Sequence, residues 1–554
     1  MKKRLMMAMA LILATMLLSS CSMLPMLYLQ GARNDHTQNV PVVEEDEALD
    51  GEVYYESAME AMAPSGKTAF MDAAMAPMPM PEFNTEEYAA VTENGFQLVS
   101  TSPLSTFSAD VDTASYCNLR RMLNDDWSRD NIPSGAVRIE EMLNYFRYDY
   151  AKPKGDDRFG VTAQLAACPW NPEATLLLLG VRAADAPSIA DEGSNLVFLV
   201  DVSGSMDSQN KLGLVKRALT LLIDNLGEKD TLSIVTYASG EDIVIDGADP
   251  AKDRTQLIAA IESLNASGST NGERGLQQAY DVAQRHFRPH GNNRVIMCSD
   301  GDLNVGITSQ SDLHDFVSGK RETGIYLSVL GFGDGNYKDT KMETLADDGN
   351  GSYYYLDSIL EARKVLVEEL TQTLYAVADD VKFQIEFNPA KVSAYRQVGY
   401  ENRALDDQDF ENDRKDAGEV GAGACVTVMY ELIPAAEGDA DGKLRYQTSE
   451  LTEAAQGDEW LTVSMRYKDP GEAASKLQQT VVTDDAVTDD PSGDFLFAAA
   501  VAEFGLVLKN SEYRGDVGYP DVIALLKQAP LSDEYREEFF SLVKIAQRAE
   551  ALAR

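Results

Sequence analysis

Leu196-Val-Phe-Leu-Val200, followed directly by Asp201-Val-Ser203-Gly-Ser205, is the stretch of sequence that decides the fold. Five consecutive apolar residues are typical of a strand that is buried on both faces, as the strands of a parallel sheet are. A polar loop that offers one carboxylate and two hydroxyls begins where this strand ends. Because ligands of open α/β sheets bind beyond the carboxyl ends of the strands, we expect a binding site at this loop.

Strand-like and helix-like patterns alternate through the residues that follow. Apolar residues recur on one helical face of 211–226, and Gly227 ends the pattern. Further helices are predicted at 253–264, 273–287, 310–320 and 359–377, and further strands at 231–237, 294–298 and 325–332. This alternation predicts a Rossmann-like α/β fold over residues 191–378, with a doubly wound, mostly parallel sheet.

The flanks of this α/β region have different patterns. Residues 105–190 hold a short amphipathic helix pattern at 137–146 and strand-like runs at 159–166 and 175–181, which predict an N-terminal α+β module. Residues 379–490 hold alternating patterns at 381–387, 425–432 and 460–467, which predict a β-rich, sandwich-like module. The remaining residues, 491–554, predict a helical segment.

Three segments of the α/β region carry oxygen ligands at the ends of predicted elements. The first is the loop with Asp201, Ser203 and Ser205; the second holds Thr270, just before the helix at 273; the third is Asp300, directly after the strand at 294–298. Hard cations such as Mg²⁺ prefer oxygen ligands of this kind. The three segments predict a divalent metal site, and the alternative is a serine-rich turn without a metal.

Together these segments resemble the metal-ion-dependent adhesion site of von Willebrand factor A (VWA) domains. The resemblance implies that the hydroxyls of Ser203, Ser205 and Thr270 bind Mg²⁺ (or Mn²⁺ or Ca²⁺), and that Asp201 and Asp300 hold the ion directly or through water. It also implies an open coordination position, which an Asp or Glu carboxylate of a protein partner fills. No side chain in these segments is an obvious general base, so we expect a binding protein and not an enzyme.

Five segments outside the α/β region resemble the YfbK-like family of bacterial VWA lipoproteins. They are Phe107–Tyr116, Arg138–Phe146, Cys168–Asn171, Val398–Arg403 and 416–423. The resemblance runs from about residue 105 to the end of the chain and concerns the architecture more than the biochemical role.

The N-terminus predicts export and a lipid anchor. Residues 1–20 have a basic start, an apolar run that is short for a membrane span, and small residues at the end, as signal peptides do. Leu18-Ser-Ser-Cys21 resembles a lipobox, which implies acylation of Cys21; a plain secretory signal is the alternative. Two or three acyl chains anchor a protein stably. We expect an extracytoplasmic location, at the outer membrane if the organism is Gram-negative.

Residues 21–104 predict a flexible, acidic tether that is rich in Met, Ala and Pro, for which a copper site is a conceivable alternative. The chain has 90 acidic and 48 basic residues and a formal net charge of −42, which excludes nucleic acid as a partner. Five cysteines give no disulfide framework. We expect Cys117 and Cys168 to be separate buried thiols, with a disulfide between them as the alternative.

These patterns predict a membrane-anchored scaffold or adhesion lipoprotein that grips an acidic group of an unidentified protein through a metal ion. The alternative function is that of a hydrolase or other enzyme of the cell envelope, whose catalytic carboxylates come from the flanking modules.

Overall fold

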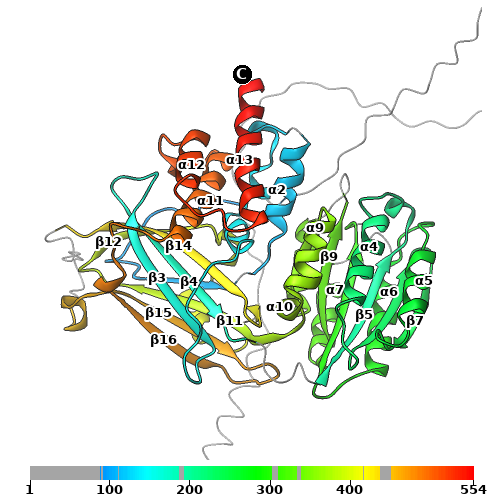
Figure 1. Cartoon of the computed structure of the whole chain (residues 1–554). Helices are drawn as coiled ribbons and strands as arrows, with labels where there is room; N and C mark the ends of the chain where they lie inside the picture. Colours follow the sequence, from blue (N-terminus) through cyan, green and yellow to red (C-terminus); the bar gives the residue numbers. More distant parts are fainter. Residues whose placement is uncertain are drawn as a thin grey trace, which may run out of the picture. The chain divides into compact units, whose positions relative to one another are not determined.

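The apolar run that opened the sequence analysis forms the middle of β5, a strand of a six-stranded sheet in a computed structural model of the protein (Figure 1). The structure describes residues 88, 91–109, 111–125, 127–185, 192–301, 310–333, 339–415, 417–436 and 451–553. In spatial order, the strands of this central sheet are β10 (Tyr353–Leu356), β9 (Tyr326–Phe332), β8 (Asn292–Ser299), β5 (Ser194–Asp201), β6 (Thr231–Tyr237) and β7 (Glu241–Ala248). All neighbours are parallel except β6 and β7, which are antiparallel. The predicted mostly parallel α/β sheet is confirmed.

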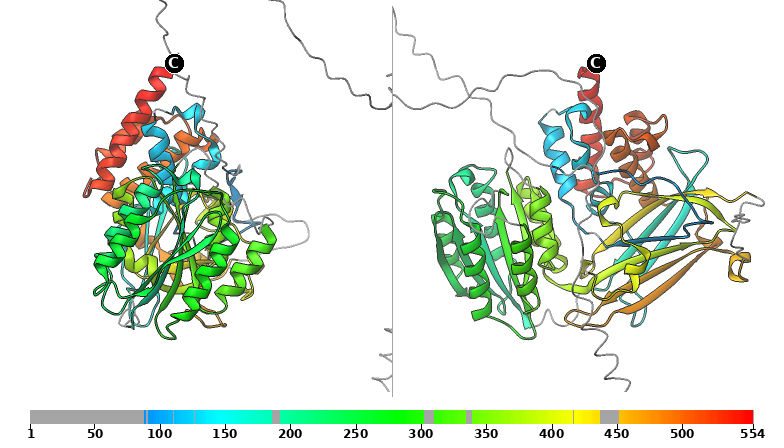
Figure 2. Two further views of the ribbon diagram at one scale, coloured as in Figure 1. Left: turned by 90° about the vertical axis from the view of Figure 1, so that its right-hand side faces the viewer. Right: turned by 180° about the vertical axis from the view of Figure 1, so that it is seen from behind.

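Helices cover both faces of this central sheet (Figure 2). Since successive side chains of a strand point to opposite faces, Phe198 and Leu199 of β5 lie in two different apolar clusters. The cluster of Phe198 includes residues of α4 (Leu212–Ile223), α5 (Arg254–Ser263) and α9 (Ile359–Arg363). The cluster of Leu199 includes residues of α6 (Gly272–Arg285), α7 (Gln310–Arg321) and α8 (Asp339–Asp348). The sheet is therefore doubly wound.

The prediction of one continuous helix at 359–377 is wrong, because the helix is interrupted inside this range and ends before residue 377. The chain forms α9, a π-helical segment η5 (Lys364–Glu368) and α10 (Leu370–Leu374), and then enters strand β11 (Ala376–Phe387). Ala376 pairs with Gly421 of β13, so pairing with a distant strand ends the helix before the apolar pattern does. The strands β7 and β10 and the helix α8 were not predicted from the sequence.

Two antiparallel sheets enclose a second core. The first contains, in spatial order, β1 (Gln97–Leu98), β12 (Val392–Val398), β14 (Cys425–Pro434), β4 (Thr175–Ala183) and β3 (Phe159–Ala167). The second contains β13 (Gly418–Gly421), β11, β15 (Glu459–Lys468) and β16 (Lys476–Thr483), with β2 (Leu104–Ser108) paired to β11. Leu179 of the first sheet and Phe383 of the second belong to the same buried cluster, as expected of a sandwich.

The sandwich joins parts of the chain that the sequence analysis treated as separate modules. β4 pairs with β14 from Thr175↔Leu432 to Arg182↔Cys425, and β2 pairs with β11. Strands from residues 105–190 and strands from residues 379–490 therefore belong to one sandwich. The predicted tether also ends early, because Gln97 pairs with Tyr395 and the side-chain amide of Asn94 donates to the Gly399 carbonyl at 2.8 Å.

A helical layer packs against the first sandwich sheet. It consists of α2 (Ala114–Asn124), α3 (Ile139–Asn144), α11 (Gly493–Lys509), α12 (Tyr519–Leu526) and α13 (Glu534–Ala553). Leu176 and Leu178 of β4 share a buried cluster with α11, which is buried along most of its length. The predicted helix at 137–146 contains α3, whereas α2 was not predicted from the sequence.

Cys117, Cys168, Cys298 and Cys425 are free thiols, so the disulfide considered between Cys117 and Cys168 is not formed. In the part of the chain that the structure describes, no helix is both long and apolar enough to cross a membrane. The predicted signal peptide, Cys21 and the possible copper-binding methionines lie outside the described residues.

Candidate functional site

The two candidate carboxylates come from neighbouring strands of the central sheet. Asp201 is the last residue of β5, and Asp300 directly follows β8. These strands are parallel and in register from Ser194↔Asn292 to Val200↔Cys298, so both carboxylates lie at the same edge of the sheet. Both residues are fully buried, with exposed fractions of 0%. The hydroxyl of Ser299 donates to Asp201 Oδ2 at 3.4 Å and links the two strand ends.

The loop after β5 folds back on its own carboxylate. The backbone N–H of Ser203 donates to Asp201 Oδ1 at 2.8 Å, and the hydroxyl oxygens of Ser203 and Ser205 are 3.0 Å apart. Ser203 is buried, whereas Ser205 is exposed. The loop therefore holds two adjacent hydroxyls, of which the first is buried and the second is accessible to solvent.

The segment that carries Thr270 is held against this loop by backbone hydrogen bonds. The N–H of Gly204 donates to the Gly268 carbonyl at 3.0 Å, and the N–H of Ser267 donates to the Val202 carbonyl at 2.7 Å. Gly268 has a φ of +83°, and a Cβ there would lie 2.4 Å from the Ser239 hydroxyl, so a glycine is required. Thr270 is buried. The structure thus gathers the three predicted segments at one sheet edge, while metal binding by their five candidate ligands stays a prediction.

The electrostatics of this edge favour a cation. Burial raises the pKa of Asp201 to about 6; the nearby Asp300 carboxylate adds to the rise, and the N–H of Ser203 opposes it. A carboxyl whose pKa is raised by burial and a like charge is stabilised in its ionised form when a positive ion binds beside it. Carboxylate and hydroxyl oxygens with no sulfur or imidazole are a donor set for Mg²⁺, Mn²⁺ or Ca²⁺. The donor set and the pKa of Asp201 therefore fit the predicted ion.

Sequence reasoning missed Lys211, a third charged residue at this edge. Its ammonium donates to Asp300 Oδ2 at 3.0 Å, and its side chain is 10% exposed. Lys211 precedes the first turn of α4, where the helix dipole disfavours a cation. A lysine at a predicted helix start is a sequence signal that could have identified Lys211. Residues that are unfavourable for the local structure often belong to functional sites.

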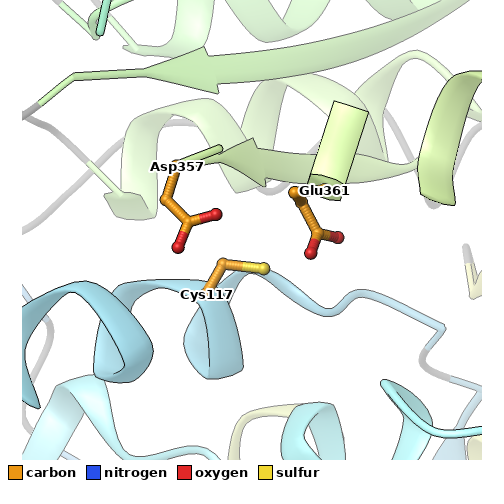
Figure 3. Close-up of side chains that lie close together, drawn as sticks. All are labelled: Cys117, Asp357 and Glu361. Carbon is orange, nitrogen blue, oxygen red and sulfur yellow. The ribbon is translucent and has the colours of Figure 1, made fainter. Parts of the chain in front are cut away.

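A second group of acidic side chains lies elsewhere, where α2 meets α9 (Figure 3). Cys117 Sγ and carboxylate oxygens of Asp357 and Glu361 all lie within 4.8 Å of one another. The Arg120 guanidinium donates to Asp357 Oδ2 at 2.7 Å and to Glu361 Oε2 at 2.8 Å, and Tyr145 OH also donates to Glu361 Oε2 at 2.8 Å. These contacts give the two carboxylates a resident cation, although Glu361 Oε1 accepts no hydrogen bond from a described residue. We interpret the group as an ion-pair centre and not as a metal site, because Arg120 already compensates its charge.

Three family models match the chain. The von Willebrand factor type A domain matches residues 195–369, which contain all five candidate ligands. A model described as von Willebrand factor matches residues 82–178, and a model of the C-terminal part of the uncharacterized protein YfbK matches residues 372–549.

Relatives share different parts of the chain. The uncharacterized protein YfbK of Escherichia coli (strain K12) is 40% identical over 475 residues, which cover 83% of this chain and 81% of that protein. The inter-alpha-trypsin inhibitor heavy chain H3 of Mesocricetus auratus is 28% identical over 166 residues, which cover 28% of this chain and 18% of that protein. A solved von Willebrand factor type A structure from Catenulispora acidiphila is 17% identical, covers 72% of this chain and 91% of its own, and has a TM-score of 0.39. With the VWA domain and the extended match to YfbK together, the chain belongs to the YfbK family of VWA-domain proteins.

Proposed function

We propose that this protein is a membrane-anchored, extracytoplasmic binding protein that grips an acidic group of a partner through a divalent ion at its VWA domain. The observation that carries the proposal is the meeting of Asp201, the Ser203–Ser205 hydroxyl pair and Asp300 at the carboxyl edge of one parallel sheet. A site at this edge faces the solvent through Ser205, which leaves access for a ligand.

The chemistry of the candidate ligands favours binding over bond breaking. Ser203, Ser205 and Thr270 would hold the ion through neutral hydroxyls, and a bound ion would supply Lewis acidity at the open position. Neutral ligands leave more of the ion's charge for an incoming carboxylate than carboxylate ligands do. Asp201 accepts a hydrogen bond from Ser203 N–H, which orients it toward the loop and away from the role of a free base.

Two measurements on the full chain test the proposal. Calorimetric titration with MgCl₂ should show one site, which Asp201→Ala abolishes. Capture of a partner from envelope extract should require Mg²⁺, be lost in EDTA and be lost with Asp201→Ala. Asp207→Ala is the matched control, since Asp207 is an exposed carboxylate just beyond the same loop. Capture that is indifferent to EDTA and to Asp201→Ala would contradict the proposed function.

The membrane anchor has its own test. Labelling of cells with a radioactive fatty acid should mark the chain, and Cys21→Ser should remove the label and release the protein from membranes. Cys425→Ser controls for acylation of another cysteine, since Cys425 is the described cysteine with the greatest exposure. Retention of the label in Cys21→Ser would refute the lipid anchor and leave the proposed metal site unaffected.

A further inference from the structure

We infer that Lys211 is a built-in counter-cation of the VWA site, which holds Asp300 in the absence of metal and lowers the affinity of the site for divalent ions. This inference rests on the proposed metal site and assigns a residue outside its candidate ligand set. The ammonium of Lys211 lies 3.0 Å from Asp300 Oδ2, within the range of a charge-assisted hydrogen bond.

The side chain of Lys211 is held in place along its length. Gly333 follows β9 at the same edge of the sheet, and a Cβ on Gly333 would lie 2.3 Å from Lys211 Cε. Gly333 has a φ of +78°, and its carbonyl accepts a hydrogen bond from Tyr355 OH at 2.6 Å. The lysine stem therefore lies directly against a glycine backbone that is itself fixed, and the ammonium has little freedom to leave Asp300.

The electrostatic consequence follows from the shared carboxylate. Any cation that Asp300 binds approaches the Lys211 ammonium, and two positive charges that share one buried carboxylate repel each other strongly, because the interior screens charge poorly. The same ammonium compensates Asp300 when no ion is bound, so it stabilises the metal-free protein. Both effects act in one direction: they reduce the free energy that metal binding releases.

Removal of the charge should therefore tighten metal binding. Lys211→Met keeps most of the apolar stem against Gly333 and removes the ammonium. We expect its dissociation constant for Mg²⁺ to fall at least tenfold relative to wild type, which corresponds to about 1.4 kcal/mol. In EDTA the variant should unfold at a lower temperature than wild type, and MgCl₂ should raise that temperature by more than it raises the wild-type value.

The matched control is Lys216→Met, in the helix α4 that Lys211 directly precedes. Lys216 is half-exposed, and its ammonium donates to the Glu262 carbonyl at 3.0 Å, away from the metal site. Its removal changes the net charge equally and should leave the Mg²⁺ affinity within about twofold of wild type, since exposed charges are screened. Asp201→Asn in the Lys211→Met background should abolish binding and so locate the titrated ion.

The outcomes separate this inference from the proposed function. Equal or weaker Mg²⁺ binding by Lys211→Met overturns the inference, while wild-type binding still supports the proposed function. Binding by Lys211→Met alone supports the inference and contradicts a wild-type metal site at the concentrations used. Binding by neither protein overturns both. If Lys211→Met does not fold without metal, recovery of its structure on addition of MgCl₂ supports the inference, and failure to recover overturns it.

Discussion

Glu503 is a buried carboxyl group that should make the stability of this fold depend on pH. It lies on α11 among apolar residues, its side chain is 1% exposed, and its Oε1 accepts no hydrogen bond from any described residue. Burial raises the pKa of Glu503 from 4.5 to about 8, and the Asp521 carboxylate adds to the rise. The folded protein therefore keeps a proton on Glu503 at pH values at which the unfolded chain has released it.

The difference in bound protons between the folded and unfolded states sets how the free energy of unfolding changes with pH. Between pH 4.5 and about 8 the folded state binds one proton more than the unfolded state, so this group lowers stability as the pH rises through that window. Above about pH 8 the loss stays constant. Since one pKa unit corresponds to about 1.4 kcal/mol, the loss from 4.5 to about 8 amounts to about 5 kcal/mol.

Glu503→Gln removes the titrating group and keeps its shape. We expect the variant to match wild type near pH 4.5 and to become more stable than wild type as the pH rises, by up to about 5 kcal/mol at pH 9. Urea unfolding curves of both proteins at several pH values give the difference in free energy directly. Glu537→Gln, which removes an exposed carboxylate from α13, measures the general effect of one less negative charge. A Glu503→Gln difference that does not change with pH, or that falls as the pH rises, would refute the reasoning.

Three further predictions test the ion pairs and glycines of the fold. Arg120→Met should lower the free energy of unfolding by about 3–5 kcal/mol, because it leaves the buried Glu361 and the half-buried Asp357 without their cation. Arg254→Met, which breaks an exposed pair with Asp224, should lower it by only about 0.2–1 kcal/mol. Equal losses in urea unfolding would contradict the ion-pair centre. Gly333→Ala should destabilise the VWA domain by about 1–3 kcal/mol, because the φ of +78° and the adjacent Lys211 stem both oppose a Cβ. An unchanged thermal midpoint would argue against the packing of Lys211 on Gly333. Gly319 lies in α7, and a Cβ there would have no atom within 4 Å. Gly319→Ala should therefore stabilise the protein by about 1 kcal/mol. A lower thermal midpoint than that of wild type would show an unrecognised contact at this position.

Local patterns predicted the inner strands of the α/β domain well, because β5, β6, β8 and β9 are buried on both faces. The run at 196–200 is fully buried in β5, and the helix pattern after it became α4 with its apolar face on the sheet. The edges of that domain were predicted less well. The short strand β10 and the π-helical segment η5 depend on neighbours more than on their own residues, and no periodic pattern marks them.

The remaining differences concern contacts between residues that are far apart in the chain. The sequence showed strand patterns on both sides of the VWA domain, but it contained no local signal that β4 would pair with β14. Pairing of that kind is set by complementary apolar faces after the chain has folded back, and a strand pattern alone does not name its partner. Two predicted modules are consequently one sandwich, and Leu98 near the end of the predicted tether pairs with Ala394 of β12.

The sequence by itself determined the central fold and the identity of five candidate ligands. The apolar run at 196–200 marks a buried strand, and the Asp201, Ser203 and Ser205 that follow it supply oxygen ligands for a metal ion. Only the tertiary structure decided what lies beside them. Asp300 is 99 positions from Asp201 in the chain, and parallel strand pairing places both at one edge. Lys211 became part of that site because the helix start and Gly333 direct its ammonium to Asp300. The physical reason is that local sequence sets the conformation of a segment, whereas the charge that a buried carboxylate experiences depends on every segment packed around it.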